Sequence, residues 1–163
     1  MIKRLFLFLL LFGYSVDSFS THAAGMDLTY ESIGGNQYRV TLKFYRDCGS
    51  GNAIAPGFFP LDYSSNSCNY SNVSFMNQIS FQNVTPVCVT ITDPCNEPGV
   101  VGIEEYVYQT TITLPNNCTD WVLSVCETRR NGAITTINQG WFINTDLCVQ
   151  AVINNTNNYI HMC

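Results

Sequence analysis

Eight cysteines, all of which follow a short apolar N-terminal segment, constrain the fold more than any other feature of the 163-residue sequence. An even number of cysteines in an exported chain predicts a framework of up to four disulfides. A zinc site would instead need C-x-x-C pairs, or cysteines and histidines at short fixed spacing, and no such spacing occurs. The candidate disulfide cysteines are Cys48, Cys68, Cys88, Cys95, Cys118, Cys126, Cys148 and Cys163.

The pairing of these cysteines stays open, because many connectivities are compatible with the sequence. Cys88 and Cys95 flank a turn at Thr92-Asp93-Pro94, so we expect them to form a local loop. Cys48 and Cys68 lie at the two ends of a loop-rich region and are candidates for holding it. A bond between Cys118 and Cys126 is not expected, because a strand would separate them by roughly 25 Å.

The N-terminus predicts export. Positions 3 and 4 are basic, Leu5 to Phe12 is uninterruptedly apolar, and small residues at Ala23 and Ala24 suit a signal peptidase. We therefore predict a signal peptide at residues 1–24 and a single domain at residues 25–163. The apolar run is much shorter than the roughly 20 residues that span a bilayer, so membrane insertion is not expected.

Charge excludes several function classes. Charged residues make up 12% of the chain, against about 25% in average proteins, and the formal net charge is −5. Nucleic acid binding would require a basic surface, so it is not expected. Binding to an anionic membrane surface is disfavoured for the same reason.

Alternating apolar and polar residues predict a β-hairpin near the start of the domain. Met26–Ser32 and Gln37–Arg46 alternate, and Ile33-Gly34-Gly35-Asn36 joins them with two glycines that tolerate positive φ. In the second strand the residues of one face, Tyr38, Val40, Leu42 and Phe44, are all aromatic or aliphatic. We expect this face to point into a core.

The rest of the chain predicts more strands and no long helix. Loops are expected at 47–52, 55–57 and 64–72, and Asn131-Gly132 is a strong hairpin turn signal. The resulting fold class is all-β, a single antiparallel β-sandwich of seven to nine strands, immunoglobulin-like in broad architecture and stapled by disulfides. The further strand candidates are 73–82, 87–91, 102–114, 120–128, 133–138, 141–144 and 147–153.

Glu104 and Glu105 are the one adjacent pair of carboxylates. Neighbouring residues of a strand point to opposite faces, whereas acid–base catalysis needs two carboxyls that face one substrate. We expect both residues where a strand begins. The one histidine outside the predicted signal peptide, His161, lies near the C-terminus, where a nucleophilic site would be poorly ordered. No catalytic residues and no cofactor are therefore predicted.

A calcium site is a weaker hypothesis. Asp93, Asn96 and Glu97 cluster in one turn, and oxygen-rich loops of extracellular β-domains hold Ca²⁺. The simpler interpretation is an Asx turn, in which Asp93 bonds to its own backbone. The cluster does not match a dedicated calcium loop, so no metal site is predicted beyond these candidates.

Two other groups of side chains have both a functional and a structural interpretation. Arg129 and Arg130 precede a predicted hairpin tip, where they would bind carboxylates or simply be solvated. Aromatic residues would provide a platform for sugar rings, but Trp121 and Trp141 lie in strand contexts, where core positions are more common.

Several separated motifs occur in an order that is typical of one protein family. These segments are Thr21–Tyr30, Gly35–Tyr38, Tyr45–Gly51, Val101–Tyr108, Thr111–Pro115 and Cys126–Ile134. In them the chain resembles the N-terminal domain of large exported surface proteins of Bacteroidota, which are adhesin-like, carry PKD or immunoglobulin-like repeats, and are associated with gliding motility and type IX secretion. The resemblance implies a surface role without a catalytic site, and relatives would continue beyond Cys163.

Two function classes follow. The first is an exported non-catalytic surface or extracellular module with an adhesive or structural role, as a free domain or as the first part of a longer surface protein. The alternative is a small secreted protein that binds or hydrolyses glycans with Glu104 or Glu105 and exposed aromatic residues. The expected partner is an extracellular protein or glycan, and the expected location is extracellular or on the cell surface.

Overall fold

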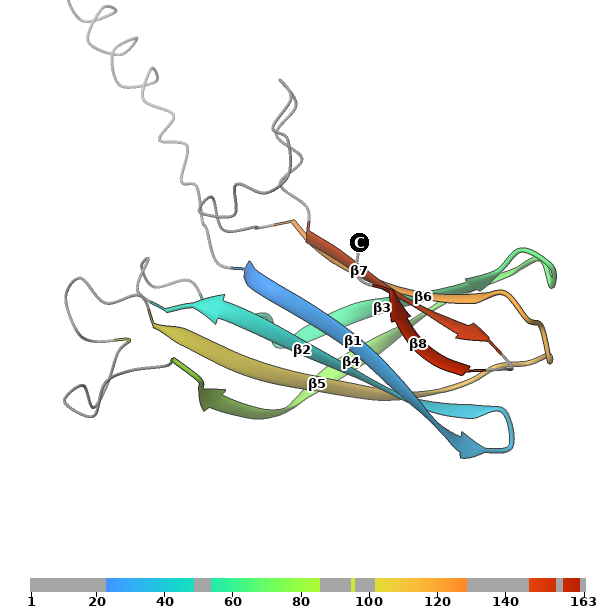
Figure 1. Ribbon diagram of the computed structural model, residues 1–163, viewed down its shortest axis with the longest axis horizontal. Coiled ribbons are helices and arrows are strands. Elements are labelled where there is room, and N and C mark those ends of the chain that lie inside the picture. Colours follow the sequence, from blue (N-terminus) through green and yellow to red (C-terminus); the bar gives the residue numbers. More distant parts are fainter. Residues whose placement is uncertain are drawn as a thin grey trace, which may run out of the picture.

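A computed structural model describes residues 23–48, 54–85, 95, 102–128, 147–154 and 157–161, with the backbone alone at 154 and 157–161. Every regular element in these ranges is a strand, and the strands form one antiparallel sheet in the order β1-β2-β5-β4-β3-β6-β7-β8 (Figure 1). The strands are β1 (Ala23–Gly34), β2 (Gln37–Asp47), β3 (Phe58–Ser65), β4 (Tyr70–Asn83), β5 (Ile103–Thr113), β6 (Trp121–Glu127), β7 (Leu147–Asn154) and β8 (Asn157–His161).

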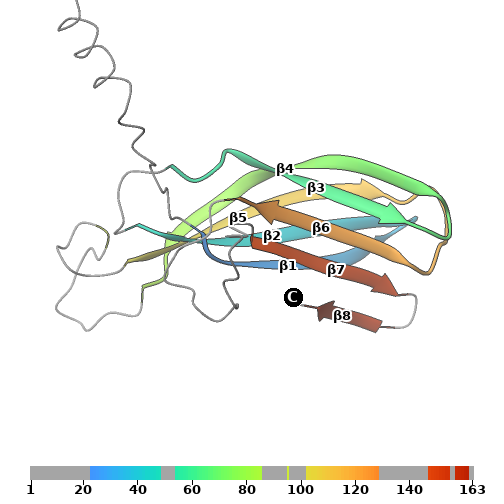
Figure 2. The ribbon, with the colours of Figure 1, turned by 90° about the horizontal axis from the view of Figure 1, so that it is seen from above.

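The sheet folds over on itself at β4. The first half of β4, Tyr70 to Asn77, pairs with β3, and its second half, Asn77 to Asn83, pairs with β5. An irregularity between Gln78 and Ser80 bends the strand where it changes partner. The two halves of the sheet therefore face each other as the layers of a sandwich (Figure 2).

Side chains from both layers meet between them. The ring of Phe59 on β3 lies 5.2 Å from that of Phe44 on β2 and 4.9 Å from that of Tyr108 on β5. At the side of the sandwich away from β4, β1 of one layer lies near β7 of the other. There the Tyr30 hydroxyl of β1 donates a hydrogen bond to the Val152 carbonyl of β7 at 3.0 Å. These contacts confirm the predicted all-β antiparallel sandwich.

The hairpin at the start of the domain is confirmed. β1 and β2 pair from Ala23 to Gly34, and the turn has positive φ at Gly34, Gly35 and Asn36. On β2 the predicted inward residues Val40, Leu42 and Phe44 are buried. β1 already begins at Ala23, whose side chain is buried in the core.

The other described strands overlap the predicted ranges, except for two strands that were not predicted. β3 was not predicted, because Pro60 and the neighbouring serines are poor strand formers. β6 pairs with β3 only from Asp62 to Ser64, so the strand is open beside Pro60 and needs no amide donor there. β8 was also not predicted. The candidate strands at 87–91, 133–138 and 141–144 lie outside the described residues.

Three disulfides are present among the described cysteines, and each joins strands that are neighbours in the sheet. Cys48–Cys95 connects the end of β2 with the segment before β5, with Cα atoms 5.2 Å apart. Cys68–Cys118 connects the β3–β4 turn with the segment before β6, at 6.2 Å. Cys126 and Cys148 lie directly opposite each other on β6 and β7, at 4.1 Å.

The expected local bond between Cys88 and Cys95 is wrong, because Cys95 bonds Cys48. Cys68 likewise bonds Cys118 rather than Cys48. The reason is topological, since β2 and β5 are adjacent in the sheet although about sixty residues separate them in sequence. The exclusion of a Cys118–Cys126 bond is confirmed. Cys88 and Cys163 lie outside the described residues.

Several disulfides fit a protein that works outside the reducing cytoplasm. Across the described ranges, no helix combines the length and the apolar character needed to cross a membrane.

Candidate functional site

Glu104 and Glu105 lie at the start of β5, between β2 and β4. Both residues are buried, with 8% and 6% of their surface exposed. Glu104 lies on the face of the sheet that carries Tyr106 and Tyr108, and Glu105 lies on the outer face. The strand alternation that the sequence predicts therefore separates the two carboxylates.

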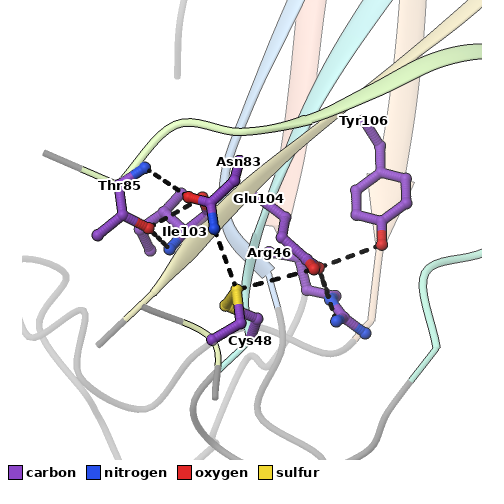
Figure 3. A network of polar contacts seen from close by, with 8 residues as sticks. Arg46, Cys48, Asn83, Thr85, Ile103, Glu104 and Tyr106 are labelled. Atoms are coloured by element: carbon purple, nitrogen blue, oxygen red, sulfur yellow. Dashed lines mark hydrogen bonds and ion pairs between the residues drawn. A yellow bond between two sulfur atoms is a disulfide. The ribbon is translucent and has the colours of Figure 1, made fainter. Parts of the chain in front are cut away.

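Glu104 is neutralised inside the sandwich by Arg46. The Arg46 Nε and NH2 atoms both contact Glu104 Oε2, at 2.7 and 2.6 Å, and the Tyr106 hydroxyl donates to the same oxygen at 3.1 Å (Figure 3). The guanidinium also lies over the Tyr106 ring, 5.9 Å from its centroid. One carboxylate oxygen thus receives an ion pair and a hydrogen bond in a position shielded from water.

The second oxygen of Glu104 faces the disulfide of Cys48 and Cys95. Glu104 Oε1 lies 3.8 Å from the Cys95 Sγ atom, and the Asn83 amide lies 3.5 Å from the same sulfur (Figure 3). Two sulfurs and a carboxylate oxygen within 4.8 Å are suitable metal ligands in kind. Because the sulfurs are bonded to each other, however, they do not offer the thiolates that zinc needs.

A group of hydrogen bonds fixes the start of β5 next to this disulfide. The Thr85 hydroxyl accepts from the Ile103 amide at 2.6 Å, and the Val84 amide donates to the Ile103 carbonyl at 2.9 Å. The Cys48 amide donates to the Gly102 carbonyl at 2.9 Å. Together these bonds hold the start of β5 between the segments that follow β2 and β4, and Figure 3 shows the bond between Thr85 and Ile103.

Glu105 has a separate set of partners on the outer face. The Tyr45 hydroxyl donates to Oε2 at 2.9 Å, the Gln82 amide donates to Oε1 at 2.7 Å, and Lys43 Nζ lies 3.4 Å from Oε2. Burial alone would raise the pKa of Glu105, but these hydrogen bonds and the Lys43 charge outweigh burial and lower it. Burial and the bond to Glu105 raise the pKa of Tyr45 to about 12.

The arrangement suits structural carboxylates better than acid–base catalysts. A general acid needs a raised pKa, whereas the pKa of Glu105 is lowered. A glycosidase needs two carboxyls that flank one bond, whereas these two lie on opposite faces of β5. Each carboxylate also has its charge balanced by a basic side chain of β2.

A third carboxylate, Asp120, organises the opposite end of the molecule. It accepts hydrogen bonds from the hydroxyls of Ser65 and Ser67 and from the Ser67 amide, beside the Cys68–Cys118 disulfide. The bonds from Ser65 and Ser67 lower the pKa of Asp120 to about 2. The result is a closed turn between β3 and β4 that is tied to the start of β6.

The remaining sequence candidates are distributed as follows. Trp121 is a core residue, as the structural interpretation predicts, with its indole donating to the Asn116 carbonyl at 3.3 Å. His161 belongs to β8, which is described by its backbone alone. The calcium candidates Asp93, Asn96 and Glu97, the arginines Arg129 and Arg130, and Trp141 lie outside the described residues.

An exposed aromatic surface on β3 and β4 was not predicted from the sequence. Phe58 and Phe75 are 55% and 59% exposed, and their rings meet edge to face with centroids 5.3 Å apart. Val73 lies beside Phe75 on the same strand face and is 47% exposed. The alternation of a strand indicates this surface: Phe75 directly precedes Met76, so the two side chains lie on opposite faces, and Met76 is in the core.

No protein-family model, no curated protein and no solved structure matches the chain. The resemblance to exported Bacteroidota surface proteins accordingly stays a prediction from the sequence motifs.

Proposed function

We propose that this chain is an exported, non-catalytic extracellular or cell-surface module with an adhesive or structural role. The observation that carries the proposal is the separation of Glu104 and Glu105 on opposite faces of β5, each balanced by a basic residue of β2. The carboxylates best placed for chemistry are thereby used to hold strands together.

The architecture supports the same proposal. Three disulfides tie neighbouring strands at both ends of the sandwich, which suits a domain that works outside the cell. The predicted signal peptide at residues 1–24 and the motifs shared with Bacteroidota surface proteins point to the same location. Low charge and an exposed aromatic surface suit binding rather than turnover.

Hydrolysis of glycans by Glu104 or Glu105 is the less favoured alternative. Glu104 is enclosed by Arg46, Tyr106 and the Cys48–Cys95 disulfide, which leaves little room for a sugar. Glycan binding without hydrolysis is compatible with the proposal, because it would use the aromatic surface instead.

Adhesion of protein-coated beads tests the proposal. The oxidised full chain is coupled to fluorescent beads, and attachment is measured to cells of the source organism and to their extracellular matrix. The matched control is the same chain after reduction and alkylation, which removes the disulfide-held fold. We expect attachment only with the oxidised chain. Equal attachment of both bead types, or attachment of neither, would overturn the proposal.

A further inference from the structure

The outer surface that contains Phe58 and Phe75 continues as a row of neutral polar side chains across the sheet. In register, Phe58 lies opposite Asn77 on β4, Asn77 opposite Gln109 on β5, and Gln109 opposite Thr41 on β2. Residues that lie opposite one another on adjacent strands share a face. Two exposed rings are therefore followed, across the bend of the sheet at β4, by two amides and a hydroxyl on the same outer surface.

The amides of this row keep hydrogen-bonding capacity. Gln109 Nε2 donates to the Thr41 hydroxyl at 3.2 Å, and within the described residues the Gln109 carbonyl oxygen accepts no hydrogen bond. Within the described residues, the exposed Asn77 side chain makes no hydrogen bond. Asn77 thus offers one acceptor and two N–H donors next to the Phe58 ring.

Charge is kept to the margin of this surface. The row itself carries no ionisable group. On the rows to either side Arg39 is paired with Glu31 and Lys43 with Glu105, and the exposed Asp62 lies opposite Val73 at the border of the aromatic surface. Pro60 interrupts the free edge of β3, which disfavours the addition of a further strand there. The face of the sheet rather than its edge is therefore the surface available to a partner.

These features match the chemistry of a sugar ring. A pyranose has an apolar C–H face, which packs on an aromatic ring, and a rim of hydroxyls, which pair with amides. A protein partner would bury the Asn77 amide and would have to supply a matching group, since an unsatisfied amide costs free energy. A neutral polymer of sugars meets both requirements at each unit.

We infer that the outer face formed by Phe58, Phe75, Asn77 and Gln109 binds a neutral polysaccharide. One ring stacks on the C–H face of a sugar, the other ring, which meets it edge to face, borders the same sugar, and the amides bond to the sugar hydroxyls. This inference rests on the proposed function and names the class of partner that the adhesive surface recognises.

Affinity electrophoresis of the oxidised full chain tests the inference. The gels contain mixed-linkage β-glucan, galactomannan or soluble starch, with alginate as the anionic comparison. Amorphous cellulose is tested by sedimentation. We expect retention by at least one neutral polymer, and Phe75→Ala and Asn77→Ala each to weaken it about tenfold, which corresponds to about 1.4 kcal/mol. Neither substitution touches the core, and a circular dichroism spectrum and thermal midpoint like those of the wild type, with the same disulfide content by mass, establish that each variant is folded.

Phe81→Ala is the matched control. Phe81 is 53% exposed, similar to Phe75, but it packs on Tyr106 and so lies on the other face of the sheet. We expect its retention to equal that of the wild type. Equal weakening by Phe81→Ala and Phe75→Ala would overturn the inference.

Other occupants give different results. A dimer in sedimentation velocity that Phe75→Ala converts to a monomer would assign the surface to a second copy of the chain and overturn the inference. Absence of retention by every neutral polymer would also overturn it. If the coated beads still attach to cells in that case, the adhesive function stands with a different partner.

Discussion

Each end of the sandwich is held by a disulfide and a carboxylate, but the two carboxylates have different partners. At one end, the Cys48–Cys95 disulfide lies beside the buried Glu104–Arg46 ion pair. At the other end, the Cys68–Cys118 disulfide lies beside Asp120, which only neutral serine groups hold. Each end therefore combines a covalent link with a carboxylate that joins strands distant in sequence.

The difference between the ends lies in the access of water. Glu104 is buried, so its negative charge requires a positive partner to be tolerated. Asp120 is in contact with solvent and needs only hydrogen bonds to fix the turn. We therefore expect changes at the Cys48–Cys95 end to cost more stability than matched changes at the Cys68–Cys118 end.

The largest effect is expected from removal of the disulfides. The two bonds span 47 and 50 residues, so chain entropy alone predicts nearly the same loss for each, about 4 kcal/mol. We expect replacement of Cys48 and Cys95 by alanine to cost more than replacement of Cys68 and Cys118, because the first change also loosens the cover of Glu104. Urea unfolding at pH 7 measures both, and a larger loss for the second pair would contradict the comparison.

Removal of Arg46, the cation that pairs with the buried Glu104, is expected to have the next largest effect. Arg46→Met leaves Glu104 charged and unpaired and should reduce the free energy of unfolding by about 3 kcal/mol. The matched control is Lys43→Met, which removes the half-exposed partner of Glu105 and should cost less than about 1 kcal/mol.

Combining Arg46→Met with Glu104→Leu should recover part of the loss, because the uncompensated charge is then gone. Urea denaturation of the three variants measures this coupling. If Arg46→Met and Lys43→Met cost the same, the distinction between the shielded Arg46 and the half-exposed Lys43 would fail.

Close packing around the Cys48–Cys95 bond predicts a smaller effect. A Cβ atom at Gly102 would overlap the Cys48 sulfur and lie 3.1 Å from the Cys95 backbone nitrogen. Gly102→Ala should therefore cost about 1–3 kcal/mol through overpacking. At Gly57 the same substitution meets nothing within 4 Å and should leave the thermal midpoint nearly unchanged. Similar midpoints for the two variants would contradict the tight packing.

The smallest effect is expected from Asp120 and depends on pH. The pKa of Asp120 is about 2 in the folded chain, below its ordinary value of 3.8, so the ionised form stabilises the fold. This contribution is complete above about pH 4 and is lost as the pH falls through about 2.

Asp120→Asn should be less stable than the wild type at pH 5, and the difference should shrink towards pH 2. Urea midpoints between pH 5 and pH 2 measure it. Glu105, whose pKa is also lowered, remains in the variant and keeps part of the acid dependence. A difference that stays constant across this range would contradict the role given to Asp120.

Local patterns allowed much of the fold to be predicted. The β1–β2 hairpin follows from two glycines and strict alternation, and the opposite orientation of Glu104 and Glu105 follows from the period of a strand. β3 was not predicted because Pro60 and the neighbouring serines are poor strand formers. The strand accommodates Pro60 because β6 does not pair with β3 at that position.

Contacts between distant segments could not be predicted. Arg46 and Glu104 are 58 residues apart, and they meet because β2 and β5 are neighbours in the sheet. The Cys48–Cys95 bond depends on the same strand order, which no local signal specifies. Phe58 and Phe75 could be placed on one face only once the register of β3 and β4 was known.

The central claim is that the chain binds its partner without turnover, because its buried carboxylates stabilise the fold. The most direct test incubates the oxidised chain with the neutral polysaccharides and measures bound protein and newly formed reducing ends in the same samples. We predict saturable binding with no increase in reducing ends over a protein-free control. Reducing ends that accumulate with the wild type but not with folded Glu104→Gln or Glu105→Gln variants would contradict the claim.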